Sequence, residues 1–195
     1  MNRQVSPASA EVGRAASLSS RIGRMAVPVA LGALVVALSA QFVVPVPLSP
    51  VPMTLQPLAV LVVGGLLGAP AGVSALVLYI ALGALGLPVF AGGGAGFLHL
   101  IGPTGGYLLA FPVAAGLTGA LVGRGARSVP RVLLACVLGM TVIHLGGVAQ
   151  LALLGGNPAA AFRMGFLPFL TGDLLKIGLA AAVILAVGPR FRPLP

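Results

Sequence analysis

Between residues 25 and 188 the sequence is a series of apolar runs separated by glycine and proline, and this pattern constrains the fold most. Each helical crossing of a bilayer core about 30 Å thick needs about 20 mostly apolar residues, so this stretch has room for about six crossings. Apolar residues make up 58% of the chain and charged residues 7%, and one soluble core of ordinary composition cannot hide that much apolar surface. We therefore predict an all-α membrane protein with six transmembrane helices.

The apolar runs define the expected helices and the connections between them. Helices are expected over about residues 25–44, 53 or 58 to 68, 71–87, 104–122, 132–154 and 166–187. Five prolines between Pro45 and Pro57 force an extended or irregular segment, because proline lacks an N–H and restricts the residue before it. Glycine and proline also interrupt residues 86–107, where retained aromatic side chains indicate a structured loop. A further loop is expected over residues 155–165.

The arginines predict the orientation, because short cytoplasmic segments are enriched in basic residues. With the N-terminus in the cytoplasm, only Arg163 falls outside. The arginines then placed inside are Arg3, Arg14, Arg21, Arg24, Arg124, Arg127, Arg131, Arg190 and Arg192. We expect a multi-pass protein of the plasma (inner) membrane with long structured outer loops. Residues 1–24 are expected to form a disordered cytoplasmic tail, 25–188 the six-helix domain and 189–195 a second cytoplasmic tail.

The formal net charge of +9 does not indicate a nucleic-acid partner. The basic residues lie in short clusters between apolar runs and almost none has an aromatic neighbour, which is typical of membrane topology. Cys136 is the only cysteine and offers no metal-site spacing, so no metal is expected. The only lysine follows Leu175, so the chain has no phosphate-binding loop of an ATPase. Paired carboxylates are also missing from the sequence, and we expect neither an enzyme nor a bound cofactor.

Asp173 and Lys176 are ionisable residues within the last apolar segment. Such side chains are costly at membrane depth and persist mainly where they are paired or bind something. At positions i and i+3 of a helix they share a face, so they can neutralise each other and can also offer a ligand an acceptor and a donor. We therefore predict that they contact a ligand about 10 Å below the outer end of the helix. The alternative is an ion pair that only cross-links the bundle.

Five further polar residues have two interpretations each. His144, in the fifth expected helix, and His99, in the outer loop, either contact a ligand or hydrogen-bond a neighbouring group. Gln150 and Asn157 face the same pocket or lie near the lipid headgroups. Arg163 attracts an anionic solute or lies at the membrane interface.

Three passages together resemble the BioY family, the biotin-specific substrate-capture (S) components of energy-coupling-factor (ECF) transporters. They are residues 50–56 (PVPMTLQ), residues 83–92 (GALGLPVFAG) with 102–107 (GPTGGY), and residues 173–176 (DLLK). The resemblance covers about residues 25–188. It implies a six-helix subunit that binds biotin at its outer side and works with a transmembrane coupling (T) protein and two cytoplasmic ATP-binding-cassette ATPases.

The resemblance also implies roles for particular residues. In such families an Ala-x-x-x-Ala surface of the first helix contacts the coupling protein, and Ala26 and Ala30 match it. Small residues at this spacing let another helix approach closely, although the same spacing also serves internal packing.

The expected ligand, biotin, has a ureido ring with N–H donors and a carbonyl, beside an apolar ring and chain. We predict that Asp173 accepts from the ureido group and that Lys176 donates to its carbonyl or to the carboxylate. Tyr107 and Thr104 are expected to line the pocket with His144. Gln56 is expected to close it from the first loop.

Two alternatives stay open at this stage. The first is an S component of the same architecture for a different small vitamin. The second is a non-transporting membrane scaffold or an intramembrane enzyme, in which Asp173 and His144 are the structural or catalytic polar groups.

Overall fold

The computed structural model describes residues 23, 25–123 and 128–191, and gives only the backbone for the last three of these. Some predicted features lie outside these ranges. They are residues 1–22 and Arg24 of the expected tail, Arg124, Arg127 and Arg192, and the side chain of Arg190.

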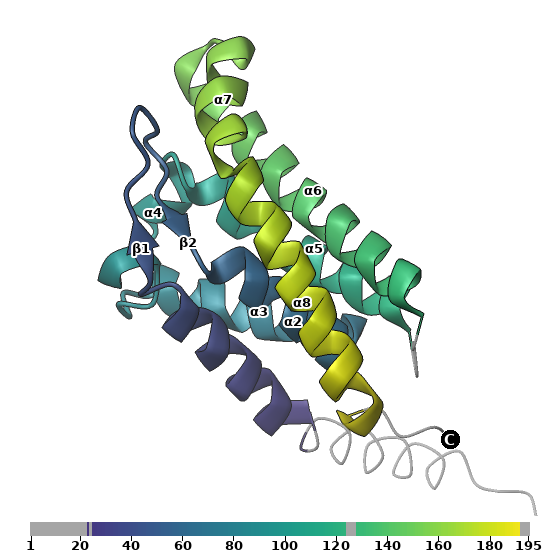
Figure 1. Ribbon diagram of the computed structural model, residues 1–195. Helices are drawn as coiled ribbons and strands as arrows, with labels where there is room; N and C mark the ends of the chain where they lie inside the picture. The colour runs from purple at the N-terminus through teal and green to yellow at the C-terminus, as the bar shows by residue number, and fades with distance from the viewer. Residues whose placement is uncertain (1–22, 24, 124–127, 192–195) are drawn as a thin grey trace, which may run out of the picture.

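Helices dominate the described chain (Figure 1). The long apolar ones are an N-terminal helix (Met25–Ser39), α2 (Gln56–Leu67), α3 (Ala69–Ala84), α5 (Gly105–Val122), α6 (Val129–Gly155) and α8 (Leu170–Phe191). The shorter helical segments are η1 (Ala91–Gly93), α4 (Leu98–Ile101), α7 (Pro158–Gly165) and η2 (Leu167–Phe169). By length and composition α5, α6 and the run Pro158–Gly188, which includes α8, could each cross a membrane, whereas the other three apolar helices are shorter. Each expected helix therefore has a counterpart.

The first expected helix is shorter than predicted, because its last turn is replaced by a strand. The helix ends at Ser39, and the β-strand β1 (Val43–Val44) pairs antiparallel with β2 (Met53–Thr54). The prediction that the helix continues to Val44 was wrong. Proline at position 45 disfavours the helical conformation of the residue before it, so Val44 is extended. The proline-rich segment is extended as expected, and it forms a hairpin.

The segment 155–165 was predicted as a loop, and the structure corrects this to a helix. Asn157 caps α7, its side-chain oxygen accepting a hydrogen bond from the backbone N–H of Ala160 at 3.0 Å. Pro158 follows in the first turn, where its missing N–H costs nothing. The expected sixth helix correspondingly begins later, because the turn η2 comes between α7 and α8.

Glycines let helices α5 and α6 approach closely. A Cβ atom at Gly106 would collide with the backbone oxygen of Gly146, and a Cβ atom at Gly146 would lie 2.5 Å from the backbone oxygen of Gly106. The two backbones are therefore in contact at this crossing, which fixes the position of the first turn of α5 against α6.

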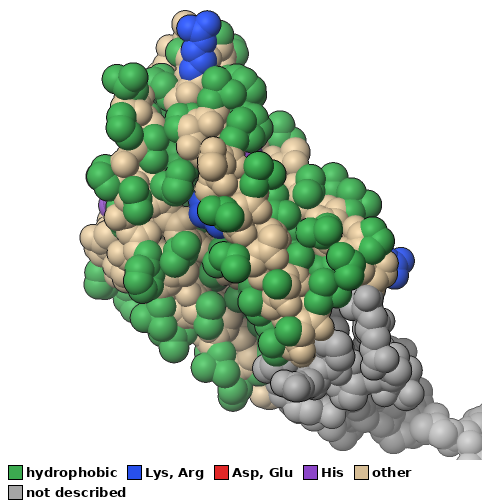
Figure 2. Space-filling view, viewed as in Figure 1, with side chains coloured by type: hydrophobic (Ala, Val, Ile, Leu, Met, Phe, Trp, Pro, Cys, Tyr) green, Lys and Arg blue, Asp and Glu red, His purple; other side chains and the backbone are tan. Residues whose placement is uncertain are grey.

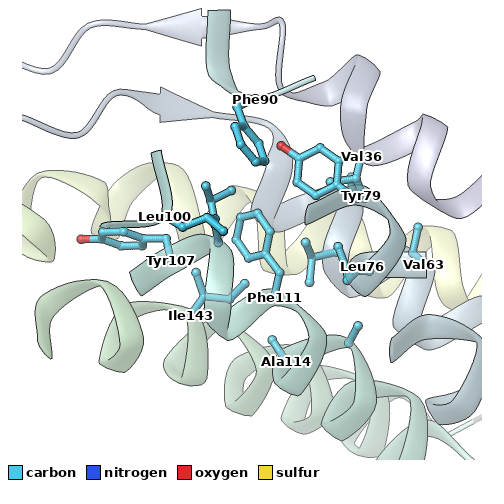
Figure 3. Packing of buried hydrophobic residues seen from close by; sticks show 14 of the residues in the cluster. Val36, Val63, Leu76, Tyr79, Phe90, Leu100, Tyr107, Phe111, Ala114 and Ile143 are labelled. Carbon is cyan, nitrogen blue, oxygen red and sulfur yellow. The ribbon is translucent and has the colours of Figure 1, made fainter. Parts of the chain in front are cut away.

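The larger hydrophobic core lies between α2, α3, α5 and the segment that carries Phe90. Figure 3 shows Tyr79, Phe90 and Phe111 gathered in this core from three different segments. The rings of Tyr79 and Phe90 meet edge to face at 5.6 Å. Phe90 is 1% exposed, and its ring fills the space that a side chain at Gly83 would need.

The outer surface is apolar as well. Figure 2 shows hydrophobic side chains over most of the visible face, with lysine and arginine at only a few places on it. Large apolar side chains such as Leu145 on α6 and Leu174 and Leu175 on α8 are more than 60% exposed. A helix surface of this kind suits contact with lipid and not with water.

Candidate functional site

A cavity of about 240 Å³ lies between the hairpin, the segment from Phe90 to Thr104, and helices α2, α5, α6 and α8. It is much larger than one water molecule, whose share of liquid volume is about 30 Å³. Its wall is mostly apolar, with contributions from Phe90, Phe111 and Phe169.

Buried polar side chains are rare in the described part of the chain, and nearly all of them gather at this cavity. Thr118 is the exception, since it packs away from the cavity wall. The others all line it: Thr54, Gln56, His144, Asp173 and Lys176. Because a buried polar group is costly unless it is paired, this concentration marks the cavity as the candidate binding site.

Asp173 is the centre of a three-residue cluster in the cavity wall. The Lys176 ammonium Nζ donates to Asp173 Oδ1 at 3.0 Å, and His144 Nε2 lies 2.6 Å from Asp173 Oδ2. All three residues are at most 7% exposed. The pair on α8 is thus held by α6 as well, and both of its members line the cavity. The Asp173 and Lys176 side chains do not face the outer surface of the bundle.

His144 is enclosed by aromatic rings. The ring centroid of Phe166 lies 5.0 Å away and that of Tyr107 6.1 Å away, both edge to face, and Phe169 lies 6.1 Å away. Its Nδ1 atom is buried without a hydrogen-bond partner. His144 therefore reaches the cluster through Nε2 alone.

Gln56, the first residue of α2, belongs to a separate chain of hydrogen bonds with Thr54 and Tyr79. Its Nε2 donates to the Tyr79 hydroxyl at 2.6 Å, and its Oε1 accepts from the Thr54 hydroxyl at 3.1 Å. Thr54 is the last residue of β2, so this chain ties the hairpin to α3. The amide of Gln56 is held in place and lines the cavity.

Tyr107 and Thr104 both line the cavity at the start of α5. The Tyr107 hydroxyl donates to the backbone oxygen of Gly165 at 2.6 Å, so its polar tip is already used in holding α7. Its ring lies against Gly147, where a side chain would collide with it.

The hairpin covers the cluster from one side. The Met53 sulfur of β2 lies against Gly172 of α8, 3.0 Å from where a Cβ atom would be, and Lys176 Nζ is 3.8 Å from the same point. Val51 and Pro52, just before β2, complete this part of the wall.

The structure separates the remaining polar candidates. His99 lines the cavity, with its ring 5.5 Å from that of Phe90. Gln150 is not in the wall, because its Nε2 donates to the backbone oxygens of Leu100 and Gly102 at 3.0 and 2.6 Å. Asn157 caps α7 and Arg163 is exposed on it, so neither is part of the cavity.

Several wall residues carried no signal in the sequence. Phe111, Ile143 and Phe169 line the cavity but are ordinary apolar residues in an apolar sequence. Within the described ranges, no group of three or more histidine, cysteine, aspartate or glutamate side chains is placed to hold a metal ion.

Ala26 and Ala30 lie on the exposed side of the N-terminal helix, far in sequence from the cavity residues. Val27 and Leu31 are 65% and 55% exposed on the same side. Ala33, by contrast, is 4% exposed and packs inward. The helix therefore packs inward at Ala33 and leaves an open apolar surface at Ala26 and Ala30.

Comparisons with known proteins agree with one another. The model of the BioY family matches residues 10–193. The probable biotin transporter BioY of Pyrococcus horikoshii is 44% identical over 160 residues, which are 81% of this chain and 93% of that protein. The biotin transporter BioY of Thermotoga maritima is 39% identical over 140 residues, 72% of this chain and 82% of that protein.

A solved structure has the same fold. It is the crystal structure of the S-component for biotin from an ECF-type ABC transporter, with a TM-score of 0.77 and 22% sequence identity. The match covers 86% of this chain and 92% of that one. With the family match and its apolar helices, this chain is a membrane protein that belongs to the BioY family.

Proposed function

We propose that this chain is the biotin-binding membrane subunit of a vitamin uptake transporter, and that biotin occupies the cavity described above. The observation that carries the proposal is one buried carboxylate, paired with an ammonium and an imidazole, in the wall of an otherwise mostly apolar cavity. The related proteins of Pyrococcus horikoshii and Thermotoga maritima are named as biotin transporters, which supports the same ligand here. A transporter component of this kind is not an enzyme, and biotin is its cargo and not a cofactor.

The chemistry of the cluster matches that of the ureido ring. Each carboxylate oxygen of Asp173 accepts one hydrogen bond from the protein and retains acceptor capacity for a ligand N–H. Lys176 uses one of its N–H donors on Asp173 and has others for the ligand carbonyl or carboxylate. The aromatic and aliphatic wall then covers the apolar ring and chain of biotin.

The other predicted site residues have secondary roles in this proposal. Thr104 and Tyr107 form the wall at the start of α5, and Gln56 forms it beneath the hairpin. His144 contacts Asp173 from α6 and holds its carboxylate in place. Because the hydroxyl of Tyr107 is bonded to Gly165, we expect its ring and not its hydroxyl to contact biotin.

We further propose six membrane spans, with both termini in the cytoplasm and the cavity opening to the outside of the plasma membrane. Arg131 lies near the first residue of α6 and Arg163 lies beyond its last residue, on α7. With Arg131 inside, the positive-inside rule puts α7 outside. The domain division into two tails and one membrane domain over 25–188 follows from the same topology.

We propose the exposed side of the N-terminal helix as the surface for the transmembrane coupling protein. Ala26 and Ala30 leave room there for a second helix to approach. Two ATPases bound to the coupling protein would supply the energy, which must change the relative affinity of the outward and inward states for biotin.

Uptake of labelled biotin tests the transport proposal. Cells that cannot make biotin would express the chain alone, or with candidate coupling and ATPase subunits, and excess unlabelled biotin, thiamine or riboflavin would be added as competitor. We expect uptake that unlabelled biotin alone suppresses. Uptake equal to that of cells without the chain, or suppression by another vitamin, would contradict the proposal.

A further inference from the structure

Both oxygens of the Asp173 carboxylate are engaged by the protein. Lys176 Nζ contacts Oδ1 at 3.0 Å, and His144 Nε2 contacts Oδ2 at the shorter distance of 2.6 Å. Lys176 is on the same helix, three residues along, whereas His144 comes from α6. The orientation of the carboxylate plane therefore depends on a contact between two helices.

Asp173 accepts a hydrogen bond from the Lys176 ammonium, and as an ionised carboxylate it also accepts the second bond, from His144 Nε2. Nδ1 of His144 is buried among aromatic rings, with no hydrogen-bond partner among the described residues. Nε2 is therefore the ring nitrogen through which His144 bonds the protein, and its bond goes to Asp173.

Asp173 and Lys176 carry one negative and one positive charge, so this ion pair has no net charge. A neutral cyclic urea suits the pair, because its ring N–H groups can donate to Asp173 and its carbonyl can accept from the Lys176 ammonium. A cationic guanidinium ring of the same shape suits it less, because it places a second positive charge beside Lys176 in the buried cavity wall. The hydrogen bond that His144 donates to Oδ2 also offsets part of the negative charge of Asp173, which weakens the attraction of the carboxylate for a cation.

We propose that His144 is a specificity-determining residue, which makes the cluster favour a neutral urea ring over a cationic guanidinium ring by engaging one oxygen of Asp173. This inference rests on the proposed function, since it assumes that the urea end of biotin meets the cluster. It adds that discrimination depends on a side chain that acts through Asp173.

Binding of biotin and of 2-iminobiotin to the purified full chain tests the proposal, at a pH where the guanidinium of 2-iminobiotin is charged. His144→Phe keeps an aromatic ring among the neighbouring rings but removes the donor. We expect the wild-type chain to prefer biotin by about 100-fold or more. The variant should lose about 10-fold of that preference, because without the hydrogen bond from His144 the Asp173 carboxylate attracts the guanidinium cation more strongly. His144→Gln, whose amide can donate in place of Nε2, should restore the preference to within about 3-fold.

A general loss of structure would lower both affinities together and leave their ratio unchanged, so the ratio is the decisive readout. Thr141→Val is the matched control, because Thr141 lies on the same helix, exposed, with its hydroxyl bonded to the Val137 backbone oxygen. If His144→Phe is not obtained as a folded protein, His144→Leu takes its place, and a wild-type ratio near one would by itself overturn the proposal.

The two proposals fail in different ways. If the wild-type chain does not bind biotin, the proposed function is wrong. Biotin binding with an unchanged ratio in the donor-free variants leaves that function standing and contradicts the role of His144.

Discussion

The cluster around Asp173 can stabilise the bundle, bind a ligand, or do both, and single substitutions confound the two effects. Removing one partner of a buried ion pair leaves a charge without compensation and is strongly destabilising. Replacing both charges together is often nearly neutral, because the desolvation cost disappears with the attraction. The comparison of single and double variants therefore separates structure from binding.

Lys176→Met should lower the free energy of unfolding by about 3 kcal/mol, because it leaves the Asp173 carboxylate buried with His144 as its sole remaining partner among the described residues. The double variant Asp173→Asn/Lys176→Met should stay within about 1 kcal/mol of the wild type, since the Asn oxygen can still accept from His144. Both variants should lose biotin binding by about 100-fold or more. Denaturant unfolding in detergent and equilibrium binding measure the two effects, and a double variant that binds biotin normally would contradict the site.

Among single residues, the sequence predicted those whose chemistry is unusual for their surroundings. Asp173 and Lys176 could be identified because charges are rare in apolar helices. The bond from His144 could not be foreseen, because it depends on how α6 and α8 are rotated about their axes. Wall residues such as Phe111 and Ile143 differ in no way from core residues in the sequence.

Among the elements, the Phe90 segment is held in place by a glycine of α3. Gly83→Ala should displace the buried Phe90 ring, which lies where the new Cβ would be, toward the cavity that it lines. We expect biotin affinity to fall by about 10-fold with a smaller effect on stability. Gly178→Ala on α8, where nothing lies within 4 Å, is the control and should bind normally. Equal affinity of both variants, measured by calorimetry, would show that the segment does not shape the site.

The crossing of α5 and α6 makes a different prediction, because backbone meets backbone there. Gly106→Ala would place its Cβ against the backbone oxygen of Gly146, which cannot move aside as a side chain can. The free energy of unfolding should fall by about 2 kcal/mol. Gly178→Ala should be neutral or slightly stabilising, because alanine favours the helix. Similar unfolding midpoints in detergent for the two variants would contradict the close crossing.

The apolar runs predicted the long helices, and the glycines and prolines between these runs predicted where the helices are interrupted. Among the short elements that were missed, β1 and α7 were missed for different reasons. Val43 and Val44 continue the apolar run of the first helix, so the change to a strand is visible only from the prolines that follow. Residues 155–158 are two glycines, an asparagine and a proline, which together suggest a loop. The Asn157 cap and the alanines that follow Pro158 nevertheless start a helix.

For the whole molecule, the orientation in the membrane is open to a direct test. In a Cys136→Ala background, Arg163→Cys should react with a membrane-impermeant maleimide added outside intact cells, whereas Arg131→Cys should react only after permeabilisation. Both side chains are exposed, and Cys136 is buried and replaced, so the label reports the side of the membrane. Labelling of both positions from the same side would rule out the proposed topology.

Calorimetric titration of the purified chain with biotin shows whether Asp173 holds the ligand, with thiamine as the comparison ligand and Asp173→Asn as the comparison protein. We expect one biotin bound per chain, no heat from thiamine, and affinity weaker by about 100-fold in the variant, since an amide cannot replace the charged acceptor. Biotin binding of full strength by Asp173→Asn would contradict this expectation.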